Sequence, residues 1–210
     1  MEKEKSGGRE HQIIKERLKK IQELESNGIN PYKTNYNKKN TIKECIDSKL
    51  DKEVQTAGRV MTKRDLGKIA FIRLKDQSGE IQVVLQKGET SEDLMKFQKR
   101  YIDAGDFIGV KGKVIKTKTG EKSILVKDLE ILTKAISPLP EKYHGIKDEE
   151  EKLRKRYLDI LFNDDIKDLF IKKQKFWSTI RNFLIQKGFL EVETPILENS
   201  AGGASATPFA

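Results

Sequence analysis

The chain has 210 residues, enough for one or two domains, and its charged residues, 36% of the total, are interspersed as in globular proteins. The single cysteine, Cys45, excludes a disulfide framework and a cysteine metal site, while the formal net charge of +9 favours a polyanionic partner. No apolar run approaches the roughly 18 residues of a membrane span, and the polar amino terminus is unlike a signal peptide, so we expect a cytoplasmic protein.

Residues 10–27 are predicted to form an amphipathic helix that ends at Asn27-Gly28. Its apolar stripe consists of Ile13, Ile14, Leu18, Ile21 and Leu24. Pro31 then turns the chain, and residues 41–50 carry a weaker helical pattern. We therefore assign residues 1–50 to a helical amino-terminal extension.

The stretch from Val54 to Leu132 predicts five strands, with a short helix between the third and the fourth. The strands are VQTAGRV, IAFIRLKD, EIQVVLQ, DFIGVKGKVIKT and KSILVKDLEIL; the helix is SEDLMKFQKRY; and MTKRDLGK is expected to be a turn. This order is typical of a Greek-key OB barrel, a fold that binds single-stranded nucleic acid on its outer sheet surface. We assign residues 51–134 to this domain.

Alternation along two of these strands separates a core face from a binding face. The core face carries Ala70, Ile72, Leu74, Ile81, Val83 and Leu85, and the opposite face carries Ile69, Phe71, Arg73, Gln82, Val84 and Gln86. An aromatic ring on a polar face stacks readily on a nucleobase. The alternative is that Phe71 lies under a neighbouring helix or loop, and the pattern of the strand alone does not choose between these interpretations.

The excess of positive charge is confined to the first two thirds of the chain. Residues 1–50 carry 12 basic and 8 acidic side chains, residues 51–135 carry 18 and 13, and residues 136–210 carry 12 of each. The net charges of the three parts are therefore +4, +5 and zero. A polyanion is thus expected to bind at or before the barrel, where Lys63 is a candidate phosphate contact.

Residues 135–165 are predicted to link the barrel to a second domain. Pro138 and Pro140 make the beginning of the linker extended, and from Asp148 the pattern becomes helical. His144, one of the two histidines, is interpreted as a surface or packing residue.

The second domain is assigned to residues 166–210. Residues 166–187 have the strongest helical period in the chain, ended by Gly188, and FLEVETPIL is then predicted to be a strand that meets Pro195. This isolated start of a domain offers few partners for Trp177, Phe183 and Phe189, so we expect exposed apolar surface there.

Several of these stretches together resemble the amino-terminal part of the class II lysyl-tRNA synthetases. They are GINPY, AGRVMTKRDLGKIAF, DQSGEIQ, KTKTGE, LTKAISPLPEKYHG and LRKRYLDILFN, while GFLEVETPIL resembles the first class II signature motif. The resemblance runs from about Ile13 to Phe209 and depends on the order and spacing of the stretches. It implies an anticodon-binding OB domain, followed by the first helix and strand of an α+β catalytic domain.

The resemblance implies that Arg64, Phe71, Gln82 and Glu121 bind the anticodon. Phe71 matches the aromatic residue that stacks on an anticodon base, and Gln82 matches the amide that reads a uridine edge. Arg64 matches the basic residue beside that amide, and Glu121 a carboxylate in the same pocket. A uridine edge offers two carbonyl acceptors and one imino donor, which side-chain N–H groups and amide or carboxylate oxygens can satisfy.

The resemblance also implies ATP-dependent attachment of lysine to a lysine-accepting tRNA with a uridine-rich anticodon, through an aminoacyl adenylate. ATP and Mg²⁺ are the implied cofactors, with ligands in motifs beyond residue 210, so we expect no catalytic residue and no metal ligand in this chain and no activity from it alone. A homodimer is implied for the complete enzyme.

Three residues of the last part of the chain match positions of the family, and a fourth departs from its pattern. Pro195 matches a motif 1 residue of the dimer interface. Gly202 and Gly203 match a loop that lies against the amino acid, although a flexible turn is an equal interpretation. Thr207 stands where the family usually has a basic residue.

Three alternatives remain at this level. Aspartyl- and asparaginyl-tRNA synthetases share the OB domain and the first motif. A stand-alone tRNA-binding OB module would need only residues 1–135. A single-strand DNA-binding OB protein needs stacking and charge, but not the edge-reading groups around Phe71.

Overall fold

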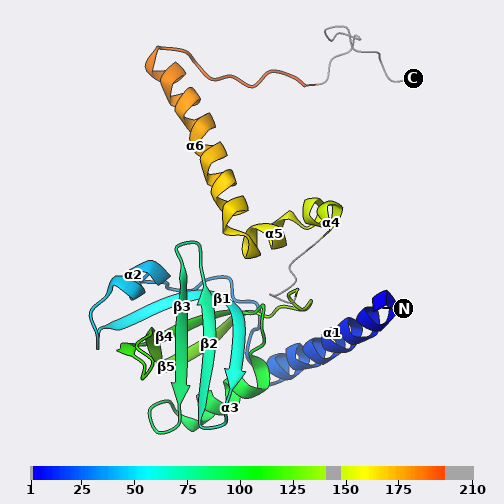
Figure 1. The fold of residues 1–210 in the computed structure, drawn as a ribbon, viewed down its shortest axis with the longest axis vertical. Helices are drawn as coiled ribbons and strands as arrows, with labels where there is room; N and C mark the ends of the chain where they lie inside the picture. Colours follow the sequence, from blue (N-terminus) through cyan, green and yellow to red (C-terminus); the bar gives the residue numbers. More distant parts are fainter. Residues whose placement is uncertain (1, 141–147, 197–210) are drawn as a thin grey trace. The chain divides into compact units, whose positions relative to one another are not determined.

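The computed structural model describes residues 2–140 and 148–196 (Figure 1). The chain divides into two compact units, with the boundary between Leu139 and Pro140. Within the described ranges, no helix is both long and apolar enough to cross a membrane. His144, Gly202, Gly203 and Thr207 lie outside the described residues.

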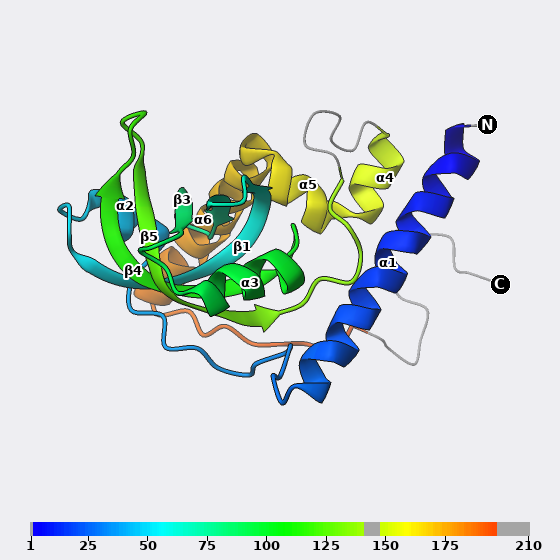
Figure 2. The same cartoon turned by 90° about the horizontal axis from the view of Figure 1, so that it is seen from below.

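The first unit is built on a closed five-stranded barrel, with strand order β1-β2-β3-β5-β4. The strands are β1 (Glu53–Asp65), β2 (Ile69–Lys75), β3 (Glu80–Gln86), β4 (Phe107–Lys116) and β5 (Lys122–Thr133). β3 and β5 pair in parallel, and the other pairs are antiparallel. Figure 2 shows the long hairpin of β4 and β5, whose connecting loop projects beyond the barrel wall. The predicted OB fold is confirmed.

The first strand is longer than the sequence pattern predicted. Residues 61–65 were expected to begin a turn, but β1 continues to Asp65. Its first part pairs with β4 and its second part with β2, with a register shift between Val60 and Thr62. The basic residues of this stretch therefore lie on a strand, because the bend at the shift lets β1 reach the edge of β2.

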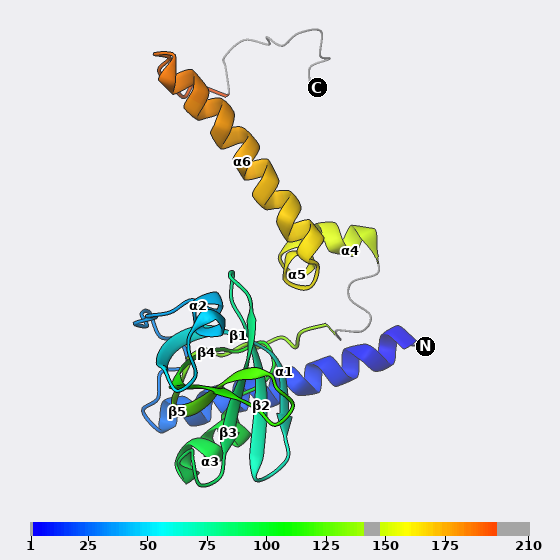
Figure 3. The same ribbon diagram turned by 60° about the vertical axis from the view of Figure 1, so that its left-hand side comes forward.

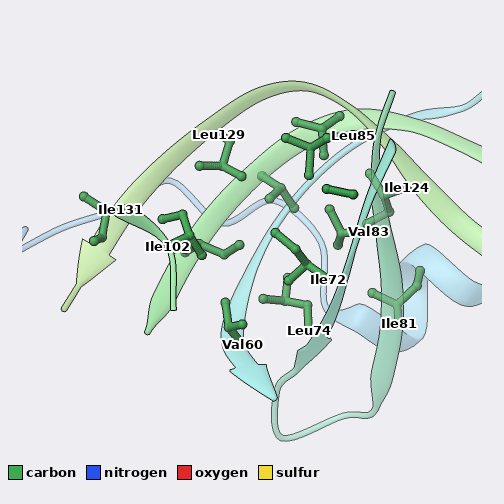
Figure 4. Close-up of a cluster of buried hydrophobic side chains, with 14 of the residues drawn as sticks. Val60, Ile72, Leu74, Ile81, Val83, Leu85, Ile102, Ile124, Leu129 and Ile131 are labelled. Atoms are coloured by element: carbon green, nitrogen blue, oxygen red, sulfur yellow. The ribbon is translucent and has the colours of Figure 1, made fainter. Parts of the chain in front are cut away.

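The predicted core faces of β2 and β3 are confirmed. Figure 4 shows Ile72, Leu74, Val83 and Ile124 pointing into the barrel interior, where each is fully buried. Val84 lies on the outer face with Gln82 and Gln86, as the alternation predicted, but its exposed fraction is only 2%. Its register partners are Phe71 on β2 and Leu125 on β5, so its short side chain lies between two larger neighbours.

Two short helices lie at opposite ends of the barrel (Figures 1 and 3). α2 (Ile42–Asp47) begins with a capping box between Thr41 and Glu44, and it inserts Ile42 and Cys45 into the core. α3 (Glu92–Tyr101) is capped by the Ser91 side chain and adds Tyr101 to the core. The weak helical signal at 41–50 and the predicted insert after β3 are both confirmed.

The amino-terminal helix, α1 (Glu2–Ser26), begins earlier than predicted and buries a slightly different face. Ile21 and Leu24 are buried, but Leu18 is 44% exposed. The buried position one turn before Ile21 belongs to Arg17. Its guanidinium donates to the carbonyl oxygens of Ala104 at 2.8 Å, Ala135 at 3.1 Å and Ser137 at 3.0 Å, so α1 is attached to the barrel by polar as well as apolar contacts.

The second unit is helical in its described part. α4 (Glu149–Arg154) and α5 (Arg156–Phe162) lead to α6 (Asp164–Gln186), which is capped by Asn163 and ends where Gly188 predicted. Trp177 and Phe183 are each 56% exposed, and Phe189 is 65% exposed, which confirms the expected apolar surface.

The predicted strand after α6 is absent from residues 189–196. A strand needs a neighbour for its backbone hydrogen bonds, and the described residues provide none for this segment. The segment instead follows the end of α6, where Phe189 N donates to Leu184 O at 3.1 Å and Arg181 Nε to Glu191 Oε1 at 2.9 Å. Pro195 lies exposed in this extended stretch.

Candidate nucleic-acid interface

A groove of about 550 Å³ runs over the outer face of the barrel. Its lining consists of Thr62, Arg64, Ile69, Phe71, Ile72, Arg73, Gln82, Val84, Gln86, Ile115, Lys116, Thr117, Lys118 and Thr119. Thus β1, β2 and β3 form its floor, while the end of β4 and the following loop form one wall. This surface is the one on which OB folds bind oligonucleotides.

Strand register brings three of the predicted site residues together. Arg64 on β1 is the partner of Phe71 on β2, and Arg73, two residues further along β2, is the partner of Gln82 on β3. Phe71 is half-buried and lines the groove, to which no helix of the described chain contributes. Of the two interpretations of Phe71, the geometry favours an accessible ring over one covered by a helix.

Glu121, the fourth predicted residue, is placed by the turn between β4 and β5. Thr117 N donates to Glu121 O at 2.9 Å, and Glu121 N donates to Thr117 Oγ1 at 3.2 Å. Gly120 has φ +86°, a left-handed conformation that glycine adopts without strain. The turn therefore delivers the carboxylate to the groove at the first position before β5.

The polar side chains of the groove form one connected network. Glu121 accepts from Arg73 Nη1 at 2.5 Å and from Gln82 Nε2 at 3.0 Å. Gln82 Oε1 in turn accepts from Ser123 Oγ at 3.1 Å. Arg73 is also 3.5 Å from a carboxylate oxygen of Glu80. The edge-reading groups are thus held in place before any ligand arrives.

Basic side chains lie around the groove rather than within this network. Arg64, Lys116 and Lys118 line the groove and are exposed to solvent. Side chains of this type contact phosphate groups and give nucleic-acid binding its dependence on salt. The exposed cations of the groove are thus separate from the hydrogen-bonded network of Arg73, Gln82 and Glu121.

The structure does not place Lys63 among the phosphate contacts. Neighbouring strand residues face opposite sides, so Lys63 points away from Arg64 and the groove. Its ammonium group donates to the carbonyl oxygens of Gln98 at 2.5 Å and Ile102 at 2.8 Å, at the carboxyl end of α3. Burial lowers the pKa of this amine. The expected phosphate contact was wrong, and the residue stabilises the end of a helix.

Residues flanking Arg64 on both sides attach β1 to α3. Lys63 makes the contacts described above, and the carboxylate of Asp65 accepts hydrogen bonds from Gln98 Nε2 at 3.1 Å and from Gly67 N at 2.8 Å. The backbone hydrogen bond to Gly67 lowers the pKa of Asp65. Arg64 therefore projects toward the groove from a segment that is anchored on its opposite side.

Two contributors to the network were not assigned from the sequence. Arg73 was placed on the correct face but given no partner, because its contact with Glu121 spans 48 residues. Ser123 was not considered, although a serine directly before the apolar run of β5 is a detectable signal. Its exposed fraction is zero, which shows that its hydroxyl serves an internal partner.

The described residues, 2–140 and 148–196, contain no group of three or more His, Cys, Asp or Glu side chains arranged to hold a metal ion, and no chemical step is assigned to a metal in them.

Two family models match the chain. Residues 54–132 match the OB-fold nucleic acid binding domain model, and residues 148–210 match the model of class II tRNA synthetases (D, K and N).

Curated proteins named lysine–tRNA ligase are similar over nearly the whole chain. The chain is 44% identical over 202 residues to the protein of Carboxydothermus hydrogenoformans, covering 95% of this chain and 41% of that protein. It is 45% identical over 203 residues to the protein of Thermosipho melanesiensis (92% and 40%) and 42% identical over 210 residues to that of Halalkalibacterium halodurans (94% and 41%). The chain thus spans about two fifths of the length of these relatives.

Proposed function

We propose, on the premise that the chain belongs to the class II tRNA synthetases of the D, K and N group, that its groove recognises the anticodon of a lysine-accepting tRNA. The family model covers three amino acids, and the similarity to lysine–tRNA ligases over more than nine tenths of the chain supports lysine among them. The barrel would then supply tRNA selection.

The observation that carries this proposal is the convergence of four residues on one face. Arg64, Phe71 and Gln82 come from three neighbouring strands, and Glu121 comes from the β4–β5 turn. An aromatic ring, a fixed amide with its carboxylate, and an exposed guanidinium supply the three contacts that a splayed-out base requires.

Each residue has a role that follows from its chemistry. The half-buried ring of Phe71 stacks on one anticodon base. Gln82 offers an N–H and a carbonyl oxygen to the edge of a uridine, which presents both acceptors and a donor. Arg64 and Lys118 neutralise neighbouring phosphates, so binding should weaken as salt rises.

For the complete protein we propose lysine–tRNA ligase activity, with an aminoacyl adenylate as the intermediate and ATP and Mg²⁺ as cofactors. ATP supplies the energy that activates the lysine carboxylate. The roles of Pro195 at a dimer interface, and of Gly202 and Gly203 against the amino acid, belong to the same proposal, as do a homodimer and a cytoplasmic location. The domain limits proposed with it are 51–134 for the anticodon-binding domain and 166–210 for the first part of the catalytic domain, joined by residues 135–165.

The proposal is tested with a synthetic RNA stem-loop that carries the anticodon UUU. We expect the 210-residue chain to bind this stem-loop more tightly than one in which the three bases are replaced by guanines. The difference should disappear in the Gln82→Ala variant, while salt dependence persists. Equal affinity of the unaltered chain for both stem-loops, measured by fluorescence anisotropy, would contradict anticodon recognition.

A further inference from the structure

We propose that Ser123 and Arg73 fix the orientation of the Gln82 amide, and that this orientation makes the groove select uracil over cytosine. The inference rests on the proposed anticodon recognition and goes beyond it. It assigns the choice between the two pyrimidines to residues that need not touch the base.

The orientation of the amide follows from the chemistry of its partners. A carboxylate carries no hydrogen and only accepts, so the atom of Gln82 that faces Glu121 at 3.0 Å must be the amide nitrogen. The carbonyl oxygen then faces Ser123, whose hydroxyl donates to it at 3.1 Å. The two contacts lie at opposite atoms of one planar group, so together they determine which atom occupies which position.

Arg73 holds the carboxylate that imposes this orientation. Its Nη1 is 2.5 Å from Glu121 Oε1, while the other carboxylate oxygen accepts from Gln82. The guanidinium has only donors to offer, so it fixes the carboxylate in place through one oxygen. A carboxylate cannot donate, so it rejects the flipped amide, whose oxygen would face it.

After these contacts the amide keeps one N–H and one carbonyl lone pair for a ligand. At the edge formed by atoms N3 and O4, uracil presents a donor beside an acceptor. At the equivalent edge, cytosine presents an acceptor beside a donor. Once stacking fixes the position of the base, a rigid amide can satisfy only one of the two, whereas an amide free to flip can satisfy both.

Ser123 is the informative residue, because it is fully buried and belongs to the parallel pairing of β3 with β5. Its register partner is Gln82 itself. A side chain with no exposed surface cannot touch a bound base, so any effect of Ser123 on base choice must act through Gln82. A purely structural role would instead change stability or overall affinity without changing the preference between bases.

The experiment measures the ratio of dissociation constants for a UUU stem-loop and its three single U→C variants. At the position that Gln82 reads, we expect the unaltered chain to prefer uracil by about fivefold to a hundredfold, the range of one bidentate base contact. Ser123→Ala should reduce this ratio by about two- to tenfold, the equivalent of one neutral hydrogen bond. Glu121→Gln should reduce it further, because an amide at 121 can pair with Gln82 in either orientation.

Two controls separate positioning from stability. Ser48→Ala removes another buried serine hydroxyl, one that does not line the groove and that donates to Glu44 O over 2.7 Å. This variant should leave the ratio of dissociation constants unchanged. In a Gln82→Ala background, Ser123→Ala should have no further effect on the ratio. Thermal melts of all variants show whether each is folded. If Ser123→Ala does not fold, Glu121→Gln, a substitution at a half-exposed position, tests whether the amide orientation determines the preference for uracil.

The outcomes distinguish this inference from the function on which it rests. If the unaltered chain binds the UUU stem-loop and its triple-guanine counterpart equally, anticodon recognition itself fails. If it separates those two but binds the three U→C variants as tightly as UUU, recognition stands and the selection of uracil over cytosine is refuted. If the unaltered chain prefers uracil and folded Ser123→Ala keeps the full ratio, recognition stands and the orienting role is refuted. A uniform loss of affinity for all four RNAs would likewise assign Ser123 to the structure of the sheet.

Discussion

Replacing Phe71 by alanine tests the binding face most directly. The ring lines the groove on the outer side of β2, whereas Leu74 on the same strand is fully buried and does not line the groove. Loss of one base–aromatic stack weakens binding by about 1–3 kcal/mol. We therefore expect Phe71→Ala to raise the dissociation constant for the UUU stem-loop by about five- to 150-fold.

The same substitution should affect stability only moderately. Alanine in place of a fully buried phenylalanine costs about 3–5 kcal/mol, and Phe71 is half-buried, so about 1–2 kcal/mol is expected from area alone. Leu74→Ala is the matched control on the same strand. It removes a fully buried side chain and should cost about 2–5 kcal/mol, while the folded fraction keeps its affinity for RNA.

Urea unfolding and fluorescence anisotropy on both variants decide between the faces. The expected pattern for Phe71→Ala is weak RNA binding with little loss of barrel stability, and the expected pattern for Leu74→Ala is the reverse. The reasoning is refuted if Phe71→Ala unfolds the barrel as readily as Leu74→Ala while its folded fraction binds RNA with full affinity.

Three further predictions concern residues outside the base-reading network. Lys134 is fully buried, with its ammonium group 2.7 Å from Asp106 Oδ2. Lys134→Met would leave this buried carboxylate without its ion-pair partner, so it should lower the free energy of unfolding, measured in urea, by about 3–5 kcal/mol. An unchanged free energy of unfolding would contradict this prediction. Lys63→Met should lower the free energy of unfolding by about 1–3 kcal/mol, because the contacts of Lys63 with backbone carbonyl groups are lost. It should leave unchanged both the affinity for RNA and the slope of log affinity against log salt concentration, whereas Lys118→Ala should reduce that slope by about 1. Burial opposes ionisation of Asp76, yet hydrogen bonds from Lys38, Ser78 and the Ile42 backbone lower its pKa to about 2. Because this value lies below the unfolded-state pKa of about 3.9, ionised Asp76 stabilises the fold by about 2 kcal/mol above pH 4, and this stabilisation is lost as the pH falls toward 2. Asp76→Asn should therefore flatten the dependence of the free energy of unfolding on pH between 4 and 2. A pH dependence identical to that of the unaltered chain would refute the stabilising role of Asp76.

The barrel could be predicted because its strands carry their own signal. Alternation in IAFIRLKD and EIQVVLQ follows directly from the two sides of a strand, so the buried positions of Ile72 and Val83 were readable without knowledge of the neighbours. The same periodicity placed Phe71 and Gln82 on one face. The role of that face in nucleic-acid binding came from the fold type and the family resemblance.

Errors arose where a neighbouring element decides what a residue contacts. Leu18 continued the apolar stripe of α1, but the barrel receives the helix on the side of Arg17, whose three carbonyl partners lie far along the chain. The alternation predicted the face of Val84 correctly but not its low exposure, which its cross-strand neighbours determine. The segment 189–196 has strand-like residues, but it has no strand beside it in the described chain.

Local order was thus determined by the sequence itself: which stretches form strands, where turns and caps lie, and which side chains share a face. Each of these depends on residues a few positions apart, whose spacing the backbone geometry converts directly into direction. The assembly of the groove was decided only by the tertiary structure. Arg73, Gln82, Glu121 and Ser123 meet through strand pairings that span up to 48 residues, and the bend in β1 turns Lys63 toward α3 while Arg64 faces the groove. Such contacts depend on register and closure of the barrel, which no local spacing encodes.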